Sequence, residues 1–162
     1  KSDPRTDIFP FSSFDYSSGS RAAAEHLVAK GARNIAFVGG LPDRPITTER
    51  VSGYLSVMRE YGLEPLVLEG RATRAFGNES ALRLCSEFRE VDAAISFIDL
   101  VALGMLSGFS RFGRMPGKDF RLVGFDDIDV APFTIPPLTT ISQSGVGTPA
   151  PRRARASRCS SP

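Results

Sequence analysis

Residues 31–40 read GARNIAFVGG, and this stretch decides the fold. Its centre, Ile35-Ala36-Phe37-Val38, is an unbroken apolar run that ends at two glycines. A strand with one face in water alternates apolar and polar residues, whereas a strand covered on both faces is apolar throughout. The stretch therefore predicts an inner strand of a parallel sheet with helices on both sides.

Helices and strands alternate on both sides of this stretch. Helices are expected from Ser17 or Ser18 to Lys30, from Thr47 or Thr48 to Gly62, over 76–89 and from Leu100 to Phe112; further strands are expected at 66–68, 93–97, 120–123 and 138–141. The first four strands start about 30 residues apart, which is typical of successive βαβ units. The sequence therefore predicts an α/β fold with a doubly wound parallel sheet and helices on both faces.

The composition sets limits on the class of protein. The chain has 162 residues, 41% of them hydrophobic, which suits one globular domain or a little more. Its two cysteines, Cys85 and Cys159, and its single histidine have no metal-ligand spacing, so no cofactor or metal is expected. No apolar run approaches the ~20 residues of a membrane-spanning helix. Because the chain begins at Lys1 without a signal-like stretch, we expect a piece of a longer cytoplasmic protein.

The formal net charge of +2 comes from one end of the chain. Residues 144–162 contain four arginines and no acidic residue, and the rest of the chain holds 16 Lys and Arg against 18 Asp and Glu. The main body is therefore mildly acidic, with a net charge of −2. Such a body is not expected to form a nucleic-acid-binding surface.

Polar residues follow the expected strands at one edge of the sheet. Ligands of open parallel sheets bind at the carboxyl ends of the strands. The candidates there are Arg50 at the start of the second helix, Ile98-Asp99 after the third strand, and Asp126-Asp127 after the fourth. An arginine that donates and carboxylates that accept predict a site for a small hydroxylated or charged ligand.

Each of these features also has a structural interpretation. Gly39-Gly40 lacks the G-x-G-x-x-G pattern and the Walker lysine, so it is weak evidence for phosphate binding. Asp99 is equally suited to be a helix N-cap. Asp126-Asp127 is either a turn or an acidic pair for a metal or a phosphoryl group.

The remaining chemistry-bearing residues point to packing rather than to function. His26 on the first helix is expected to be packed or partly exposed. Cys85 is expected to act as a small buried hydrophobic residue. Phe109 and Phe112 are expected to be core or interface residues.

Several motifs occur together along the chain in a fixed order. They are Gly19-x-Arg21-x-Ala23-x-Glu25-His26-Leu27 with Gly31 to Gly40, Glu49-Arg50-x-x-Gly53-Tyr54, Asp99-x-x-Ala102-Leu103-Gly104, Val123-Gly124-Phe125-Asp126-Asp127 and Pro136-Pro137-Leu138-Thr139-Thr140-Ile141. Over about residues 12–143 this pattern resembles the LacI/GalR family of bacterial transcriptional regulators.

The resemblance implies an architecture and a set of partners. Members join a helix-turn-helix that reads operator DNA to a two-lobed domain similar to periplasmic sugar-binding proteins, with the effector between the lobes. On that plan residues 1–14 are the end of the first lobe and the hinge, residues 15–143 are the second lobe, and residues 144–162 are an atypical, disordered basic tail. A small-molecule effector and a homodimer are implied, with operator DNA bound only through a helix-turn-helix absent from this chain, and no membrane.

The resemblance also implies residue roles. It places effector contacts at Arg50, Asp126 and Phe97-Ile98-Asp99, with Phe14 as an apolar wall near the hinge. Arg50 would fork onto two ligand oxygens, and Asp126 would accept from hydroxyl groups. Nothing serves as a nucleophile with its base, so no catalysis is expected. The implied dimer contacts are Leu103, Leu106, Phe109 and Phe112 with the stretch 128–133, unless this stripe only faces the sheet.

Two departures from the family pattern matter. The family usually has asparagine where this chain has Ile98, and losing its donor and acceptor costs ~1–3 kcal/mol of affinity for a sugar. Either the effector is less hydroxylated than a sugar or it binds weakly. The tail after Gln143 also departs, which suggests a shifted reading frame or an altered gene end. A periplasmic binding protein, a phosphoacceptor or metal enzyme using Asp126-Asp127, and a fragment without ligand binding stay open as alternatives.

Overall fold

The computed structural model describes residues 15–142, which form one five-stranded sheet in the order β2-β1-β3-β4-β5. All four pairs of neighbouring strands are parallel. The strands are β1 (Ile35–Val38), β2 (Leu66–Leu68), β3 (Ala93–Ser96), β4 (Arg121–Phe125) and β5 (Thr139–Ile141). The strand positions inferred from the apolar runs are therefore confirmed, with β4 extending two residues beyond its expected end.

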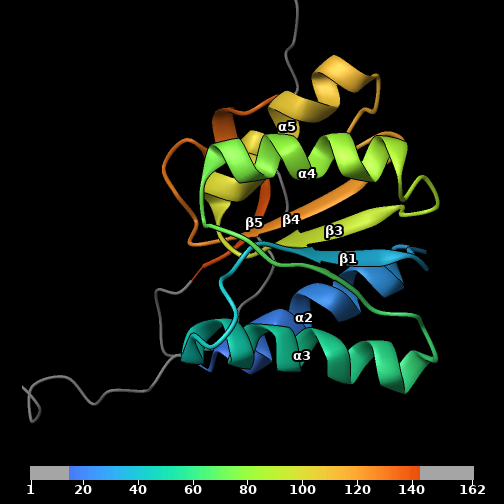
Figure 1. Cartoon of the computed structure of the whole chain (residues 1–162), viewed down its shortest axis with the longest axis vertical. Coiled ribbons are helices and arrows are strands. Elements are labelled where there is room, and N and C mark those ends of the chain that lie inside the picture. Colours follow the sequence, from blue (N-terminus) through green and yellow to red (C-terminus); the bar gives the residue numbers. More distant parts are fainter. Residues whose placement is uncertain (1–14, 143–162) are drawn as a thin grey trace, which may run out of the picture.

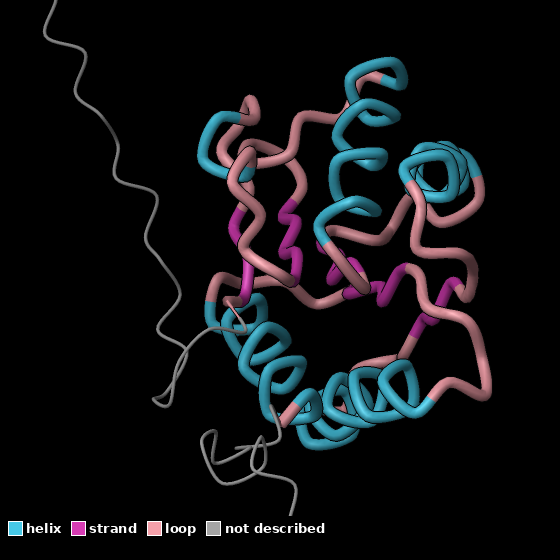
Figure 2. The backbone as a smooth tube through the Cα atoms, turned by 90° about the vertical axis from the view of Figure 1, so that its left-hand side faces the viewer, coloured by secondary structure: helices cyan, strands magenta, loops and turns pink. Residues whose placement is uncertain are grey.

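Two helices cover each face of the sheet. In Figure 1, α2 (Tyr16–Ala29) and α3 (Pro45–Tyr61) lie below the sheet, and α4 (Arg74–Ser86) and α5 (Asp99–Phe112) lie above it. Figure 2 shows the same two layers from the side, with the short helix η1 (Ala131–Phe133) beyond β4. The doubly wound parallel fold predicted from the sequence is confirmed.

The alternation of side chains along β1 explains why its whole apolar run is buried. Ile35 and Phe37 belong to the core between the sheet and helices α2 and α3. Ala36 and Val38 belong to the core between the sheet and helices α4 and α5. Successive side chains of a strand point to opposite faces, so a central strand covered twice needs no polar position. Tyr54 of α3 closes the first core, since its hydroxyl donates to the Ile35 carbonyl at 2.6 Å. Burial raises the pKa of Tyr54 to about 12.

The helix starts differ from those expected. Asp15, not Ser17 or Ser18, caps α2, and its carboxylate accepts from the Ser18 amide at 2.9 Å. Thr73 caps α4 in the same way, so this helix begins two residues earlier than expected and also ends earlier, at Ser86. The third difference is that α3 begins at Pro45, because proline fits the first helical position, where its missing amide proton is not needed.

Two further expectations concern single features. Cys85 is half-buried against the core under α4 and α5, and burial raises the pKa of its thiol. Between residues 15 and 142, no helix combines the length and the apolar character that crossing a bilayer requires. Cys159, the residues assigned to the hinge and the basic tail lie outside the described residues.

Candidate functional site

Arg50 is the centre of the candidate site. It lies in the second turn of α3, and only 3% of its side chain is exposed. Three aromatic rings surround its guanidinium, with centroids 5.1 Å (Tyr16), 4.7 Å (Phe97) and 4.5 Å (Phe125) from Cζ. The negative faces of aromatic rings stabilise a nearby cation. The rings thus hold this buried arginine in one position at the carboxyl edge of the sheet.

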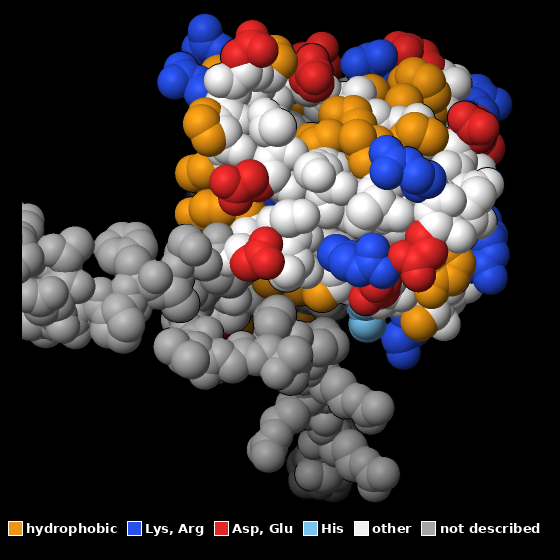
Figure 3. All heavy atoms as spheres, turned by 90° about the horizontal axis from the view of Figure 1, so that it is seen from below, with side chains coloured by type: hydrophobic (Ala, Val, Ile, Leu, Met, Phe, Trp, Pro, Cys, Tyr) orange, Lys and Arg blue, Asp and Glu red, His pale blue; other side chains and the backbone are white. Residues whose placement is uncertain are grey.

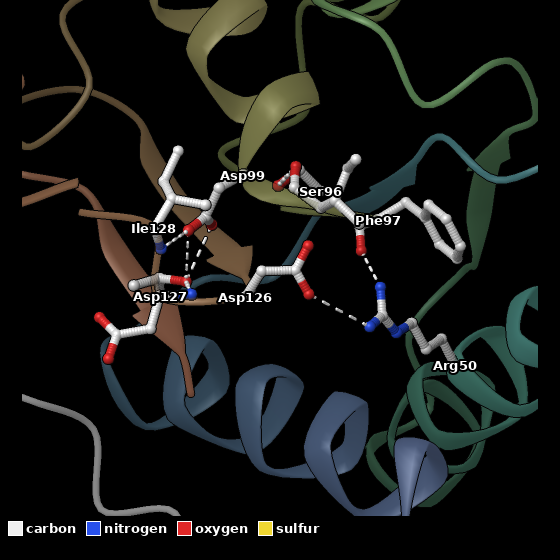
Figure 4. Close-up of polar contacts among 9 residues, drawn as sticks. Arg50, Ser96, Phe97, Asp99, Asp126, Asp127 and Ile128 are labelled. Atoms are coloured by element: carbon white, nitrogen blue, oxygen red, sulfur yellow. Dashed lines mark hydrogen bonds and ion pairs between the residues drawn. The ribbon is translucent and has the colours of Figure 1, made fainter. Parts of the chain in front are cut away.

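The polar contacts of Arg50 use only part of its donor set. Nη1 donates to the Phe97 carbonyl oxygen, and Nη2 lies 3.7 Å from Oδ1 of Asp126, as Figure 4 shows. Among the described residues, no acceptor pairs with its buried Nε. Burial lowers the pKa of Arg50, and the nearby charge of Asp126 opposes this effect. Arginine stays protonated in proteins, so the site keeps one fixed positive charge.

Asp126 and Asp127 have different positions despite being adjacent. The Asp126 carboxylate faces Arg50 with a third of its side chain exposed, whereas the Asp127 carboxylate points away from Arg50 (Figure 4). The two carboxylates therefore do not form the paired site that a metal or phosphoryl enzyme would need. No group of three or more metal-ligating side chains occurs within the described range 15–142.

The backbone of this loop is strained. Asp126 has φ = +100° and Asp127 has φ = +50°, in the region that favours glycine. Non-glycine residues held in such conformations cost of order 1–3 kcal/mol each, and they cluster at ligand sites and switch regions. The strain at Asp126 therefore agrees with a functional role for the loop.

Asp99 is not the N-cap of α5, which was the structural expectation for it, and its role as a ligand contact stays a prediction. It is fully buried, and Ile98 is the N-cap residue of α5. Its carboxylate accepts from the Ile128 amide at 3.1 Å and from the Thr140 hydroxyl at 2.8 Å. A Cβ on Gly124 would lie 2.0 Å from its Oδ1, so only glycine leaves room for this carboxylate. Asp99 thus ties α5 to β4 and β5 from within.

Burial also changes the acidity of this carboxyl group. It raises the pKa of Asp99 to about 6, although the hydrogen bonds from Ile128 and Thr140 act in the opposite direction. A carboxyl group in this position titrates close to neutral pH, unlike an ordinary aspartate.

The other expected ligand contacts are only partly brought together. Phe97 lies beside Arg50, as expected from the sequence. Ile98 is half-buried against the core under α4 and α5. Phe14 lies outside the described residues.

Three residues of the site were not predicted from the sequence: Tyr16, Phe125 and Thr140. Tyr16 and Phe125 supply two of the three rings around Arg50, and Thr140 binds the Asp99 carboxylate. These contacts join segments that are far apart in sequence, so no local pattern announces them. The only available signal was the position of Phe125 between the fourth strand and Asp126.

An apolar pocket of about 300 Å³ adjoins the site. It is lined by Leu41, Arg44, Pro45, Ile46, Thr47, Ala72 and Phe97. Leu41 and Ile46 are about 40% exposed, although both are large hydrophobic residues. Phe97 lines this pocket and also packs on Arg50, so one side chain is common to the pocket and the site.

The stripe assigned to a dimer interface is mainly internal. Phe109 is fully buried and packs on Phe120 with ring centroids 4.6 Å apart, so its assignment to an interface is wrong. Leu103 and Leu106 are half-buried, and Leu106 packs against the core. Phe112 alone of the four is exposed, at 40%. Most of this apolar stripe of α5 faces the sheet. A helix that packs on a sheet needs the same periodic apolar face as one at an interface.

Comparisons with known proteins agree with this geometry. A family model described as "Periplasmic binding protein-like domain" matches residues 24–147. The HTH-type transcriptional regulator AscG of Escherichia coli K12 is 30% identical over 130 residues, covering 78% of this chain and 39% of AscG.

Solved structures give the same result. A LacI-family regulatory protein from Chloroflexus aggregans has a TM-score of 0.76 and 29% identity, over 79% of this chain and 47% of that protein. The Lac repressor, bound to ONPG in its repressed state, has a TM-score of 0.75 and 29% identity over 80% of this chain and 40% of its own. The chain thus spans less than half the length of these relatives, which are transcriptional regulators.

Proposed function

The chain belongs to the periplasmic binding protein-like domain family, in the form carried by LacI-family regulators, and from this premise we propose that it binds a small-molecule effector for a bacterial transcriptional regulator. The observation that carries the proposal is the buried, ring-enclosed Arg50 facing the half-exposed Asp126 at the carboxyl edge of the sheet. This is the edge where open parallel sheets bind ligands. The proposal includes a non-catalytic role and a cytoplasmic location, as for the DNA-binding relatives.

The spacing of Arg50 and Asp126 suits an oxygen-bearing ligand. Their 3.7 Å separation is longer than the 2.7–2.9 Å of a close charge-assisted hydrogen bond. At this spacing a ligand hydroxyl group would donate to Asp126 and accept from Arg50. The rings around Arg50 keep the guanidinium in place, so little side-chain entropy is lost on binding.

The apolar pocket supports one of the two explanations of Ile98, a less hydroxylated effector. A weakly binding sugar site would still need polar walls, but the adjoining pocket is mainly apolar, with Arg44 and Thr47 as its polar lining residues. Ile98 removes hydrogen-bonding capacity from the same edge. We therefore propose an effector with one polar, hydroxylated end at Arg50 and Asp126 and an apolar group of limited size in the pocket.

The regulatory step would depend on parts of the protein beyond this chain. An effector shifts an equilibrium between two arrangements only by its difference in affinity for them. If the Arg50 edge closes against a second lobe in one arrangement, the effector changes the DNA affinity of the intact regulator. A homodimer is part of the proposal, with the exposed side chains of Phe112 and Phe133 as its contacts in this chain.

The test is a thermal-shift comparison of matched glycosides with this chain. Phenyl and methyl β-D-glucoside differ only in the apolar group, and we expect the phenyl compound to stabilise more. A ligand at a hundred times its Kd stabilises by about 2.7 kcal/mol, so saturating stabilisation is measurable. Asp126→Asn should abolish the response, and Asp129→Asn, an exposed change in the same loop, should preserve it.

A second variant tests the role of Ile98. Ile98→Asn restores an amide at this edge, and it should improve binding of the methyl glucoside relative to the phenyl glucoside. The proposed site is wrong if stabilisation survives both Asp126→Asn and Arg50→Ala. A chain that responds to neither glucoside nor to other sugars and small metabolites contradicts ligand binding by this chain alone.

A further inference from the structure

A second pocket lies at the opposite edge of the sheet from Arg50. Its volume is about 230 Å³. The last turn of α2 contributes His26 and Lys30, the first residue of β4 contributes Arg121, and Pro136 and Pro137 precede β5. The amino ends of parallel strands meet at one edge, so this pocket is separate from the candidate effector site.

The pocket concentrates positive charge. His26 belongs to α2, Lys30 is the C-cap of that helix and Arg121 belongs to β4, and none of the described side chains that line the pocket is acidic. Within residues 15–142, none of the three forms an ion pair, whereas Arg21 and Arg83 pair with glutamates. On the face shown in Figure 3, several other Lys and Arg side chains lie beside Asp and Glu. The described lining of this pocket therefore carries basic groups alone, in a body with more acidic than basic residues.

The acidity of His26 shows that the three groups act on one another. Burial lowers the pKa of His26, and the charges of Lys30 and Arg121 lower it further. These two are the titratable groups that face His26, one from its own helix and one from β4. Like charges that repel at this distance are stabilised when an anion binds between them.

The carboxyl end of α2 does not use these cations. Its last carbonyl oxygens, at His26, Leu27 and Val28, accept from the amides of residues 30–32 and from the Arg33 guanidinium. The helix end is therefore satisfied without the side chains of His26 and Lys30. Their charges stay available to a ligand.

The walls and size of the pocket restrict the class of ligand. Leu27, Leu122, Val123 and Leu138 supply apolar surface beneath the charged rim. The volume is below the usual 300–1,000 Å³ of a drug-sized ligand, so the occupant is small. Two cations and a titratable imidazole, with apolar walls, suit a compact carbon skeleton that carries several negative charges.

We propose that this pocket binds a small organic anion with at least two negative charges, a polycarboxylate or a phosphate ester, as a ligand distinct from the effector at Arg50. His26 and Arg121 contact its charged groups from opposite sides, and Lys30 closes the rim. The apolar walls contact its carbon skeleton.

The test uses the only histidine of the chain as a reporter. The His26 Hε1 resonance is followed by NMR as a function of pH, with and without citrate, glucose 6-phosphate or inorganic phosphate. A bound anion stabilises the protonated imidazole, so the pKa of His26 should rise by about one unit, a tenfold preference for the charged form. A larger pKa shift with citrate than with glucose 6-phosphate identifies carboxylates as the preferred charged groups, and the reverse order identifies a phosphate.

Matched variants distinguish a specific anion-binding site from a general effect of ionic strength on the pKa of His26. The exposed pair Lys30→Gln and Arg121→Gln should remove the response, while Arg59→Gln, which removes an exposed cation of α3, should leave it unchanged. The proposal fails if sodium chloride at equal ionic strength gives the same shift, or if the double variant still responds. It also fails if Asp126→Asn abolishes the response, because the anion would then bind at the Arg50 site.

Discussion

At the carboxyl edge of the sheet, Arg50 is buried among three rings and faces Asp126, whereas at the amino edge His26, Lys30 and Arg121 surround an open pocket that contains no carboxylate. Burying a charge carries a desolvation penalty that its surroundings must offset. An exposed charge carries no such penalty. Substitutions of the buried groups at the carboxyl edge should therefore change folding stability most, while those of the exposed Lys30 and Arg121 at the amino edge should change ligand binding alone.

The largest effect is expected for Asp99→Ala at the carboxyl edge. The change leaves the Ile128 amide and the Thr140 hydroxyl without their buried acceptor. Two such groups at about 1–3 kcal/mol each predict a loss of about 4 kcal/mol in the free energy of unfolding, measured in urea at pH 5. Asp129→Ala, at an exposed position, should stay within about 0.5 kcal/mol of the original chain. Equal losses in the two variants would contradict the internal role of Asp99.

The next effect is a dependence of stability on pH. The pKa of Asp99 is about 6 in the folded chain, against 3.8 for the ordinary group, so folding favours the protonated form. Its contribution to stability is complete below pH 3.8 and is lost as the pH rises through 6. The difference amounts to about 3 kcal/mol at most. Asp99→Asn, which does not titrate, should show a smaller fall in stability between pH 4 and pH 7; parallel curves would contradict the raised pKa.

Asp126→Asn should have a smaller effect on stability. The carboxylate is one third exposed and 3.7 Å from Arg50, and such an ion pair contributes about 1 kcal/mol or less. We expect a thermal midpoint close to that of the original chain, together with loss of the glycoside response. A large destabilisation would show that Asp126 acts mainly as a structural partner of Arg50.

The smallest effect on stability is expected for Lys30→Gln at the amino edge. The side chain is exposed, so the free energy of unfolding should change by less than about 0.5 kcal/mol. Removing this charge should nevertheless raise the pKa of His26, because Lys30 lowers it in the original chain. An NMR titration without added anion measures this shift. An unchanged pKa would mean that Lys30 and His26 do not act on each other.

The order of elements could be predicted from the sequence because both the strands and the helices carry strong local patterns. Ile35 to Val38 are apolar without a break, and the burial of all four explains why. The helix starts were predicted less accurately. Asp15 caps α2 where Ser17 or Ser18 was expected, and Thr73 caps α4, which begins two residues before its expected start. The sequence alone does not rank neighbouring candidates for a cap. The differences in capping free energy between such candidates are smaller than the free energy of the contacts that the folded loop adds.

The site could be predicted as a location but not as a set of contacts. The rule that ligands lie at the carboxyl ends of strands brings Arg50 and Asp126 together correctly, and the family resemblance adds Phe97. The role of Asp99 could not be predicted from the sequence, because its partner Thr140 lies 41 residues away, on strand β5. The burial of Arg50 was also unexpected, since the ring cage exists only after α2, β3 and β4 have packed together.

Both ends of the described body lie at the same edge as Arg50. Tyr16, at the start of α2, places its ring over the guanidinium, and Ser142 follows the carboxyl end of β5. A second body joined through either end would be tethered next to the site, at an effective concentration set by the length of the linker. Two tethers at one edge would also confine that body to rotation about the line between them. Fluorophores attached at residues 15 and 142 would therefore report directly on movements at the mouth of the site.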